Sequence, residues 1–164
     1  MHRYVVALGS NMRVPGVGDP SAVVRAAITA MAAAGMAIER VSPVLRTRPV
    51  GPSHRTYANA AALVAANLGP PALLEVLQRI ESAFGRRRRG GRWRARTLDL
   101  DIVLWNGGVW RSAGLIVPHP HWTKRPFVLG PAAHVAPRWR EPKTGRTARQ
   151  LVGRAPIRAA GLPR

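Results

Sequence analysis

The sequence predicts a single α+β domain in which an antiparallel sheet carries helices. Three observations lead to this fold class: stretches typical of strands alternate with two stretches of helical period, the chain has 164 residues, and 46% of them are hydrophobic. A chain of this length buries roughly two-thirds of the surface that its unfolded form exposes. One hydrophobic core is therefore sufficient to hold the domain together.

The first part of the chain predicts a strand, a helix and a second strand. Residues 3–9 are rich in β-prone side chains and end at a Gly-Ser-Asn turn. Asp19 or Ser21 can cap a helix that Gly35 ends. Residues 36–48 partly alternate between apolar and polar side chains, which indicates the second strand.

The next part predicts another strand, helix and strand. Residues 57–67 are rich in alanine, which favours a helix, but their position between a turn and a clearer helix indicates a strand. Pro70 and Pro71 open that helix and Gly85 closes it. Residues 96–105 alternate strictly and predict the last strand of this series.

The C-terminal part adds a hairpin signal at 106–108, then a loop, then helices near 126–134 and 147–152. We expect one domain over residues 1–153 and a loose tail over 154–164. The order β-α-β-β-α-β is that of ferredoxin-like folds. The C-terminal helices would cover the second face of the sheet and give three layers, α-β-α.

The charge of the chain is strongly positive, with 26 basic against 7 acidic residues. Such a field attracts nucleic acid, phosphate-rich metabolites or anionic membranes, although the scarcity of lysine also fits a coding preference for arginine. The chain has no cysteine, which excludes disulfides and thiolate metal sites. Its longest apolar stretch falls short of the ~20 residues of a membrane span. We expect a cytoplasmic protein that does not enter a membrane.

Two acidic residues stand two positions apart in the last predicted strand. Side chains alternate between faces along a strand, so Asp99 and Asp101 would share one face. Carboxylate oxygens suit Mg²⁺, which keeps water and substrate phosphates as its other ligands. A solvated strand face that offsets nearby arginines is the other interpretation, and composition alone does not decide between them.

An arginine-rich segment, residues 86–96, comes directly before this strand. Arginine binds phosphate through two parallel hydrogen bonds, and glycine permits movement, so the segment fits a lid over a phosphoryl-transfer site. A basic run with an interleaved tryptophan fits an RNA-binding arm equally well.

Further candidates are less specific when taken alone. Tyr57 and Phe127 could be core residues or could stack on a flat heterocycle. His119 could contact phosphate or be an ordinary loop histidine, and zinc lacks an evident third ligand beside His121. Glu81 could be a surface acid paired with an arginine. The sequence has no Walker-type phosphate loop, so an ATP site would have to be built in another way.

Together these stretches resemble one known family, the 6-hydroxymethyl-7,8-dihydropterin pyrophosphokinases. The similar segments occur in the family's order and cover roughly Val5 to Val152, which makes the set more specific than any one of them. They are residues 7–11, 46–52, 57–60, 78–81, 96–102, 117–120 and 125–129.

The resemblance implies an ATP-dependent diphosphotransferase of folate synthesis that transfers diphosphate from ATP to the pterin hydroxymethyl group. Asp99 and Asp101 would hold two Mg²⁺ ions, and Arg86, Arg92 and Trp93 would belong to the lid. The catalytic residues would be Arg86, Arg96, Asp99 and Asp101. The residues around ATP would be Gln78, Glu81, Arg88, Trp93, Arg96, Ile102, His119 and Arg125. The residues around the pterin would be Thr47, Val50, Tyr57, Asn59, Trp93 and Phe127.

The resemblance further implies a monomer whose partners are its two small substrates. Two other functions stay open at this point: a nucleic-acid-binding module on a ferredoxin-like sheet, and a relative that binds pterin or nucleotide without turnover. The first would need aromatic side chains on the sheet surface, of which the central strands have few.

Overall fold

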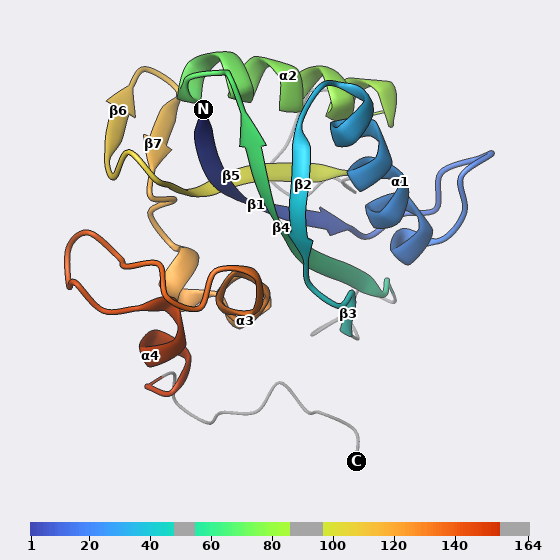
Figure 1. Cartoon of the computed structure of the whole chain (residues 1–164). Helices are drawn as coiled ribbons and strands as arrows, with labels where there is room; N and C mark the ends of the chain where they lie inside the picture. The colour runs from blue at the N-terminus through green and yellow to red at the C-terminus, as the bar shows by residue number, and fades with distance from the viewer. Residues whose placement is uncertain (48–54, 86–96, 155–164) are drawn as a thin grey trace.

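The computed structural model describes residues 1–47, 55–85 and 97–154, and its centre is an antiparallel sheet between two helical layers (Figure 1). The five-stranded sheet has the order β2-β4-β1-β5, and β3 also pairs with β4. This order and the β-α-β-β-α-β succession confirm the ferredoxin-like fold. The strands are β1 (His2–Ser10), β2 (Ala37–Val41), β3 (Leu45–Thr47), β4 (Tyr57–Ala66) and β5 (Asp99–Trp105).

Helices α1 (Pro20–Ala33) and α2 (Pro70–Ala83) cover one face of the sheet. Asp19 caps α1 by accepting the backbone N–H of Ala22 at 2.9 Å, as the sequence predicted. Tyr4, Val6 and Leu8 point from β1 into the core beneath these helices. Alternate residues of the central strand thus face the first helical layer.

The other face is covered by α3 (Pro126–Val135), on which α4 (Ala148–Val152) packs in turn. Val5 of β1 and Ala61 of β4 form a second core with Trp122 and Leu129. Trp122 belongs to a short 3₁₀ helix, Trp122–Lys124. The three-layer arrangement predicted for the domain is therefore present.

Strand β4 shows how pairing overrides local propensity. Alanine favours a helix, yet residues 58–66 are almost all buried in the middle of the sheet, between β1 on one side and β2 with β3 on the other. Small side chains on both faces let the helical layers approach this strand closely. The predicted strand at 57–67 is confirmed.

Two predicted elements differ in detail. The strand expected at 36–48 is divided into β2 and β3, because Pro43 cannot donate to the ladder and Ser42 turns inward. Ser42 accepts the N–H of Ala61 on its Oγ at 2.9 Å, which fixes the break. The strand expected at 96–105 begins at Asp99, and Arg96 lies outside the described residues.

A hairpin also replaces the loop expected after residue 108. Strands β6 (Trp110–Ser112) and β7 (Leu115–Val117) pair across a turn at Gly114, whose φ of 79° favours glycine. The signal at 106–108 is a tight turn in which Gly108 donates its N–H to the carbonyl of Trp105 at 3.0 Å. The turn predicted at 106–108 is present, but the hairpin strands β6 and β7 come after it instead of flanking it.

No helix in the described ranges 1–47, 55–85 and 97–154 is long and apolar enough to span a membrane.

Candidate active site

Asp99 and Asp101 lie on the same face of β5, as the alternation predicted. Asp99 pairs with Gly9 and Asp101 with Ala7 of β1, whereas Leu100 between them is buried in the core under α1 and α2. Both aspartates are partly exposed. Their carboxylates therefore project from the face that α3 covers in part, where they remain accessible to solvent.

A row of paired residues across β4, β1 and β5 places the Asn59 side chain near Asp99 and Asp101. Asn59 of β4 pairs with Gly9, and Gly9 pairs on its other side with Asp99. Paired residues share a face of the sheet, so Asn59 and Asp99 are separated only by a residue without a side chain. A Cβ atom on Gly9 would lie 3.1 Å from Oδ1 of Asn59, which is a tight contact.

Glu81 ties α2 to the strand that carries the aspartates. It is only 3% exposed, and its Oε1 accepts the backbone N–H of Leu100 at 2.8 Å. Strand β5 lies at the edge of the main sheet, so this carboxylate supplies an acceptor to an edge-strand amide. The surface location considered for Glu81 from the sequence is wrong, because the side chain is buried.

His119 belongs to the segment between β7 and α3, and this segment bonds to β5. Its backbone N–H bonds to the carbonyl of Val103 in β5 at 3.0 Å. Burial first, and then the positive charges of Arg125 and His121, lower the pKa of His119 below its usual value, while Asp99 acts in the opposite direction. The imidazole is thus held mainly neutral at neutral pH, within electrostatic reach of both Asp99 and Arg125.

Two large aromatic side chains near this face are exposed. Tyr57, two residues before Asn59 on β4, is 39% exposed, and Phe127 in the first turn of α3 is 43% exposed. Helix α3 packs directly against β4. These rings can therefore offer apolar faces to a flat ligand near Asn59.

Other predicted residues have different surroundings. Ile102 is 3% exposed in the core under α1 and α2, so only its backbone is available to a ligand. Gln78 lies partly exposed on α2, and Thr47 pairs with Tyr57 at the end of β3. The predicted residues Val50, Arg86, Arg88, Arg92, Trp93 and Arg96 lie outside the described residues.

Sequence reasoning assigned no role to Ser10, which supports the aspartate strand from β1. Its Oγ donates to the carbonyl of Thr97 at 2.6 Å, just before Asp99. Ser10 is 3% exposed, and it follows Gly9 in the turn motif that the sequence analysis noted. A polar residue at the end of a buried strand, directly after Gly9, was the available signal.

The donors present suit a hard cation. In the described part of the chain, no group of three or more His, Cys, Asp and Glu side chains could hold a metal by itself. Two carboxylates that leave coordination positions for water and phosphate oxygens fit Mg²⁺, whereas zinc takes three or four protein ligands. His119 and His121 therefore do not make a zinc site with described residues.

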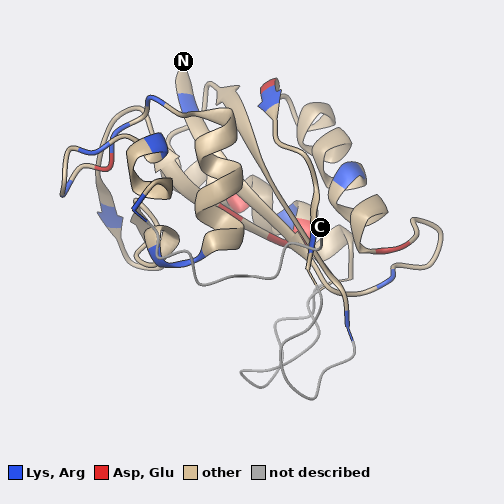
Figure 2. Ribbon diagram, turned by 90° about the horizontal axis from the view of Figure 1, so that it is seen from below, with Lys and Arg blue, Asp and Glu red and all other residues tan. Residues whose placement is uncertain are grey.

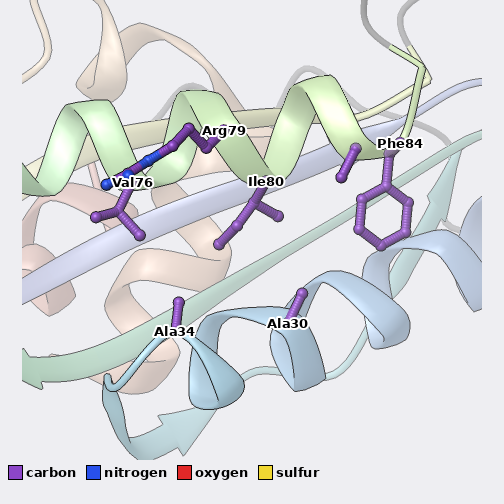
Figure 3. A pocket seen from close by; sticks show the side chains of 7 residues that line it. Ala30, Ala34, Val76, Arg79, Ile80 and Phe84 are labelled. Atoms are coloured by element: carbon purple, nitrogen blue, oxygen red, sulfur yellow. The ribbon is translucent and has the colours of Figure 1, made fainter.

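A separate groove lies between α1 and α2, on the opposite face of the sheet (Figure 3). Its walls are mostly apolar, with Ile80 of α2 and Phe84 directly after that helix opposite Ala30 and Ala34. It contains none of the predicted site residues. The candidate site is instead the open face around Asp99, Asn59 and His119.

Residues 5–137 match the model of the 7,8-dihydro-6-hydroxymethylpterin-pyrophosphokinase family. The chain belongs to this family. The match confirms the resemblance inferred from the motifs, and it includes every residue predicted for the site.

Relatives within this pyrophosphokinase family are similar over most of the chain. A Synechocystis protein named 2-amino-4-hydroxy-6-hydroxymethyldihydropteridine pyrophosphokinase is 40% identical over 152 residues, which are 92% of this chain and 75% of the relative. A Pseudomonas aeruginosa protein of the same name is 38% identical over 159 residues, 96% of this chain and 94% of the relative. An Arabidopsis folate synthesis bifunctional protein is 38% identical over 128 residues, 77% of this chain and 25% of the relative.

Proposed function

We propose that this chain is a pyrophosphokinase that transfers diphosphate from ATP to the hydroxymethyl group of 6-hydroxymethyl-7,8-dihydropterin, a step of folate synthesis. The observation that supports this most is the row formed by Asn59, Gly9 and Asp99, in a chain of the pyrophosphokinase family. In this row, the Asp99 carboxylate is suited to bind a metal ion. The Asn59 side-chain amide is suited to hydrogen-bond the edge of a heterocycle.

Asp99 and Asp101 are the proposed ligands of two Mg²⁺ ions. The ions, when bound, would offset the charge of the ATP phosphates. The shared strand face and partial exposure of the aspartates leave room for phosphate oxygens and water. Among the protein's own groups, Ser10 and Glu81 hold the backbone on both sides of Asp99.

ATP is the proposed co-substrate, and His119 and Arg125 are proposed to face its phosphates beside Asp99. A neutral His119 can donate one hydrogen bond to a phosphate oxygen without repelling the metal. Gln78, Glu81 and the backbone of Ile102 are the further proposed contacts of the nucleotide.

The pterin ring is proposed to lie between Tyr57 and Phe127. Their exposure and their positions on β4 and α3 allow two apolar faces to enclose a flat ring. Asn59 would hydrogen-bond the polar edge of the ring, with Thr47 and Val50 near it. The residues Arg86, Arg88, Arg92, Trp93 and Arg96 remain sequence-based proposals for the lid.

The proposed reaction is an in-line displacement. The pterin hydroxymethyl oxygen forms a bond to the β-phosphorus of ATP while the bond from that phosphorus to the oxygen shared with the α-phosphate breaks. AMP leaves with this oxygen, and the hydroxyl proton is released. The enzyme's contribution is mainly position and charge, because Asn59 and the aromatic pair orient the pterin and Arg125 faces the phosphates.

The protein is proposed to be active as a monomer. One chain supplies all the described candidates: Asn59 and Asp99 share the sheet face on which α3 packs, and Glu81 bonds to β5 from α2 on the other face. The alternative function as a nucleic-acid module of the sheet-binding type is not favoured. Such modules bind bases on an open sheet face, and here α3 covers that face over β1 and β4.

The test is a measurement of AMP release from Mg-ATP with and without the hydroxymethyl pterin. We expect AMP and the pterin diphosphate to appear in equal amounts, only when both substrates are present. AMP without pterin would indicate plain hydrolysis of ATP. Binding of both substrates without AMP would support the non-catalytic reading instead.

A further inference from the structure

The segment 136–154, here called the C-terminal basic segment, is far more basic than the rest of the described chain. Within nineteen residues it has six basic residues and one acidic residue, a net charge of +5. The other described residues have ten basic and six acidic residues, a net charge of +4 over more than a hundred positions. The six basic residues are Arg138, Arg140, Lys143, Arg146, Arg149 and Arg154.

A general coding preference for arginine does not explain this distribution. Such a preference would spread basic residues over the whole surface, whereas the described remainder is close to balanced. The match to the family model ends at residue 137, and all six basic residues lie after that position.

All six basic side chains are exposed: four lie in the loop before α4, Arg149 lies in α4 and Arg154 follows it. Neither of the ion pairs among the described residues involves this segment. Figures 1 and 2 place α4 and its preceding loop at the end of the molecule opposite α1, and Figure 2 shows basic positions repeated along it. The cations form an accessible surface in the outermost layer.

The backbone that displays these side chains is ordered by its one acid. Glu141 is 6% exposed, and its two carboxylate oxygens accept the backbone N–H groups of Lys143 and Thr144 at 3.0 and 2.7 Å. Glu141 and Arg146 also pair through their backbones at 2.8 Å, and Arg140 donates to the carbonyl of Gly145 at 2.7 Å. The carboxylate therefore accepts hydrogen bonds mainly from the backbone, and among the cations of the segment the charge of Lys143 also acts on it.

The start of helix α4, which also carries a basic residue, is likewise held by hydrogen bonds. Thr147 and Gln150 form a reciprocal cap, in which each side chain accepts the backbone N–H of the other residue. Arg146 directly precedes Thr147, and Arg149 directly precedes Gln150. Because the backbone of this segment is already held by hydrogen bonds, binding of a partner would cost little backbone conformational entropy.

We propose that the C-terminal basic segment is a binding surface for the phosphate backbone of duplex nucleic acid, without sequence preference and separate from the diphosphate-transfer site. Exposed arginines on a fixed loop match a repeating array of phosphates, which they bind through paired hydrogen bonds. Arginine rather than lysine is the residue type that forms such paired contacts.

The experiment measures binding of a fluorescent 20-base-pair duplex by anisotropy over a series of salt concentrations. One variant combines Arg138→Ser, Lys143→Ser, Arg146→Ser and Arg149→Ser, and keeps Arg140 because its guanidinium shapes the loop. A matched control removes the same charge from exposed residues elsewhere: Arg25→Ser, Arg40→Ser, Arg79→Ser and Arg111→Ser. Both variants keep residues 86–96 intact.

We expect the wild type to bind with a Kd of roughly 10⁻⁴ to 10⁻⁶ M near physiological salt. The segment variant should bind at least about tenfold more weakly, and its plot of log K against log salt should lose a slope of up to about 3.6, since four basic residues are removed and each phosphate contact contributes about 0.9. The control should keep most of the affinity and slope. Diphosphate transfer should be unchanged in both variants, which separates this surface from the catalytic proposal.

Three results would overturn the proposal. Equal losses in the two variants would mean that only net charge matters. Full binding by the segment variant would place the contact elsewhere, for example in residues 86–96. Absence of wild-type binding at physiological salt, or binding only to anionic vesicles, would show that duplex nucleic acid is not the partner.

Discussion

At the scale of single residues, Gly9 allows the proposed pterin contact Asn59 and the proposed metal ligand Asp99 to lie in one row of the sheet. It stands between Asn59 and Asp99 across three paired strands. Its need for glycine is one of space, since an added Cβ would press on Oδ1 of Asn59 at 3.1 Å. The glycine of the opening turn motif thus keeps a proposed pterin contact in place.

Replacement Gly9→Ala is therefore expected to weaken pterin binding and leave the fold intact. Displacement of Asn59 would cost about one hydrogen bond, roughly 0.5–1.5 kcal/mol, and raise the pterin Kd about two- to tenfold. Titration calorimetry with the pterin measures this. Gly69→Ala, where an added Cβ meets nothing within 4 Å, is the control and should bind normally. An unchanged Kd for Gly9→Ala would contradict the proposed role of Asn59.

Glu81 is the residue whose surroundings the sequence could least predict. An acid near the end of an amphipathic helix is usually exposed, whereas here it meets the buried amide of Leu100. That contact joins residues 19 positions apart, so no local pattern of the helix reveals it. Only the assembled sheet, with β5 at its edge, places an amide there.

Replacement Glu81→Ala should lower the free energy of unfolding by about 1–3 kcal/mol, because it leaves a buried N–H without this acceptor. Urea unfolding followed by circular dichroism measures the change. Glu75→Ala, an exposed position on the same helix, should change stability by less than about 0.5 kcal/mol. Equal stability of the two variants would argue against a structural contribution from the contact between Glu81 and Leu100.

At the scale of elements, local signals were sufficient for four elements: β-prone side chains and a turn for β1, cap residues for α1, and clear periodicity for α2 and β5. The division between β2 and β3 depends on Ser42 bonding to Ala61, which is a contact with another strand. The hairpin of β6 and β7 was missed because three-residue strands are too short to show a period. A contact distant in sequence decided the first case, and the shortness of the strands decided the second.

The loop before α4 provides a test of pH dependence. Burial acts to raise the pKa of Glu141, but hydrogen bonds from the N–H of Lys143 and from the hydroxyl and N–H of Thr144, with the charge of Lys143, outweigh it and hold the pKa below its usual value. A lowered pKa in the folded state means that the carboxylate stabilises the protein above the usual pKa of glutamate. This contribution is lost as the pH falls through the folded-state pKa.

Glu141→Gln should therefore unfold about 5 °C below the wild type at pH 7, and the difference should shrink towards pH 3. Thermal melts at a series of pH values measure this, with the exposed Glu75→Gln as the control that changes little at any pH. A difference between Glu141→Gln and the wild type that stays constant from pH 7 to pH 3 would contradict the ionic origin of the stabilisation.

At the scale of the whole molecule, one face of the sheet stabilises the fold and the other face also carries the candidate site. One face and its helices α1 and α2 form a core, and the other face shares its area between α3 and the candidate site. The aspartate pair could be predicted because a strand period places Asp99 and Asp101 together without further information. Their relation to His119, Arg125 and Phe127 could be expected only through the family resemblance, because it depends on how α3 returns to the sheet.

The measurement that tests the central claim most directly is pterin-dependent AMP release by Asp99→Asn and Asp101→Asn at saturating Mg²⁺. Asparagine keeps the shape and removes the charge, so the fold should persist while the rate falls at least about a hundredfold in each variant. Thermal melts confirm the fold, and Glu75→Gln is the matched control with a normal rate. A near-normal rate for either aspartate variant would contradict the assignment of this strand face as the metal and phosphate site.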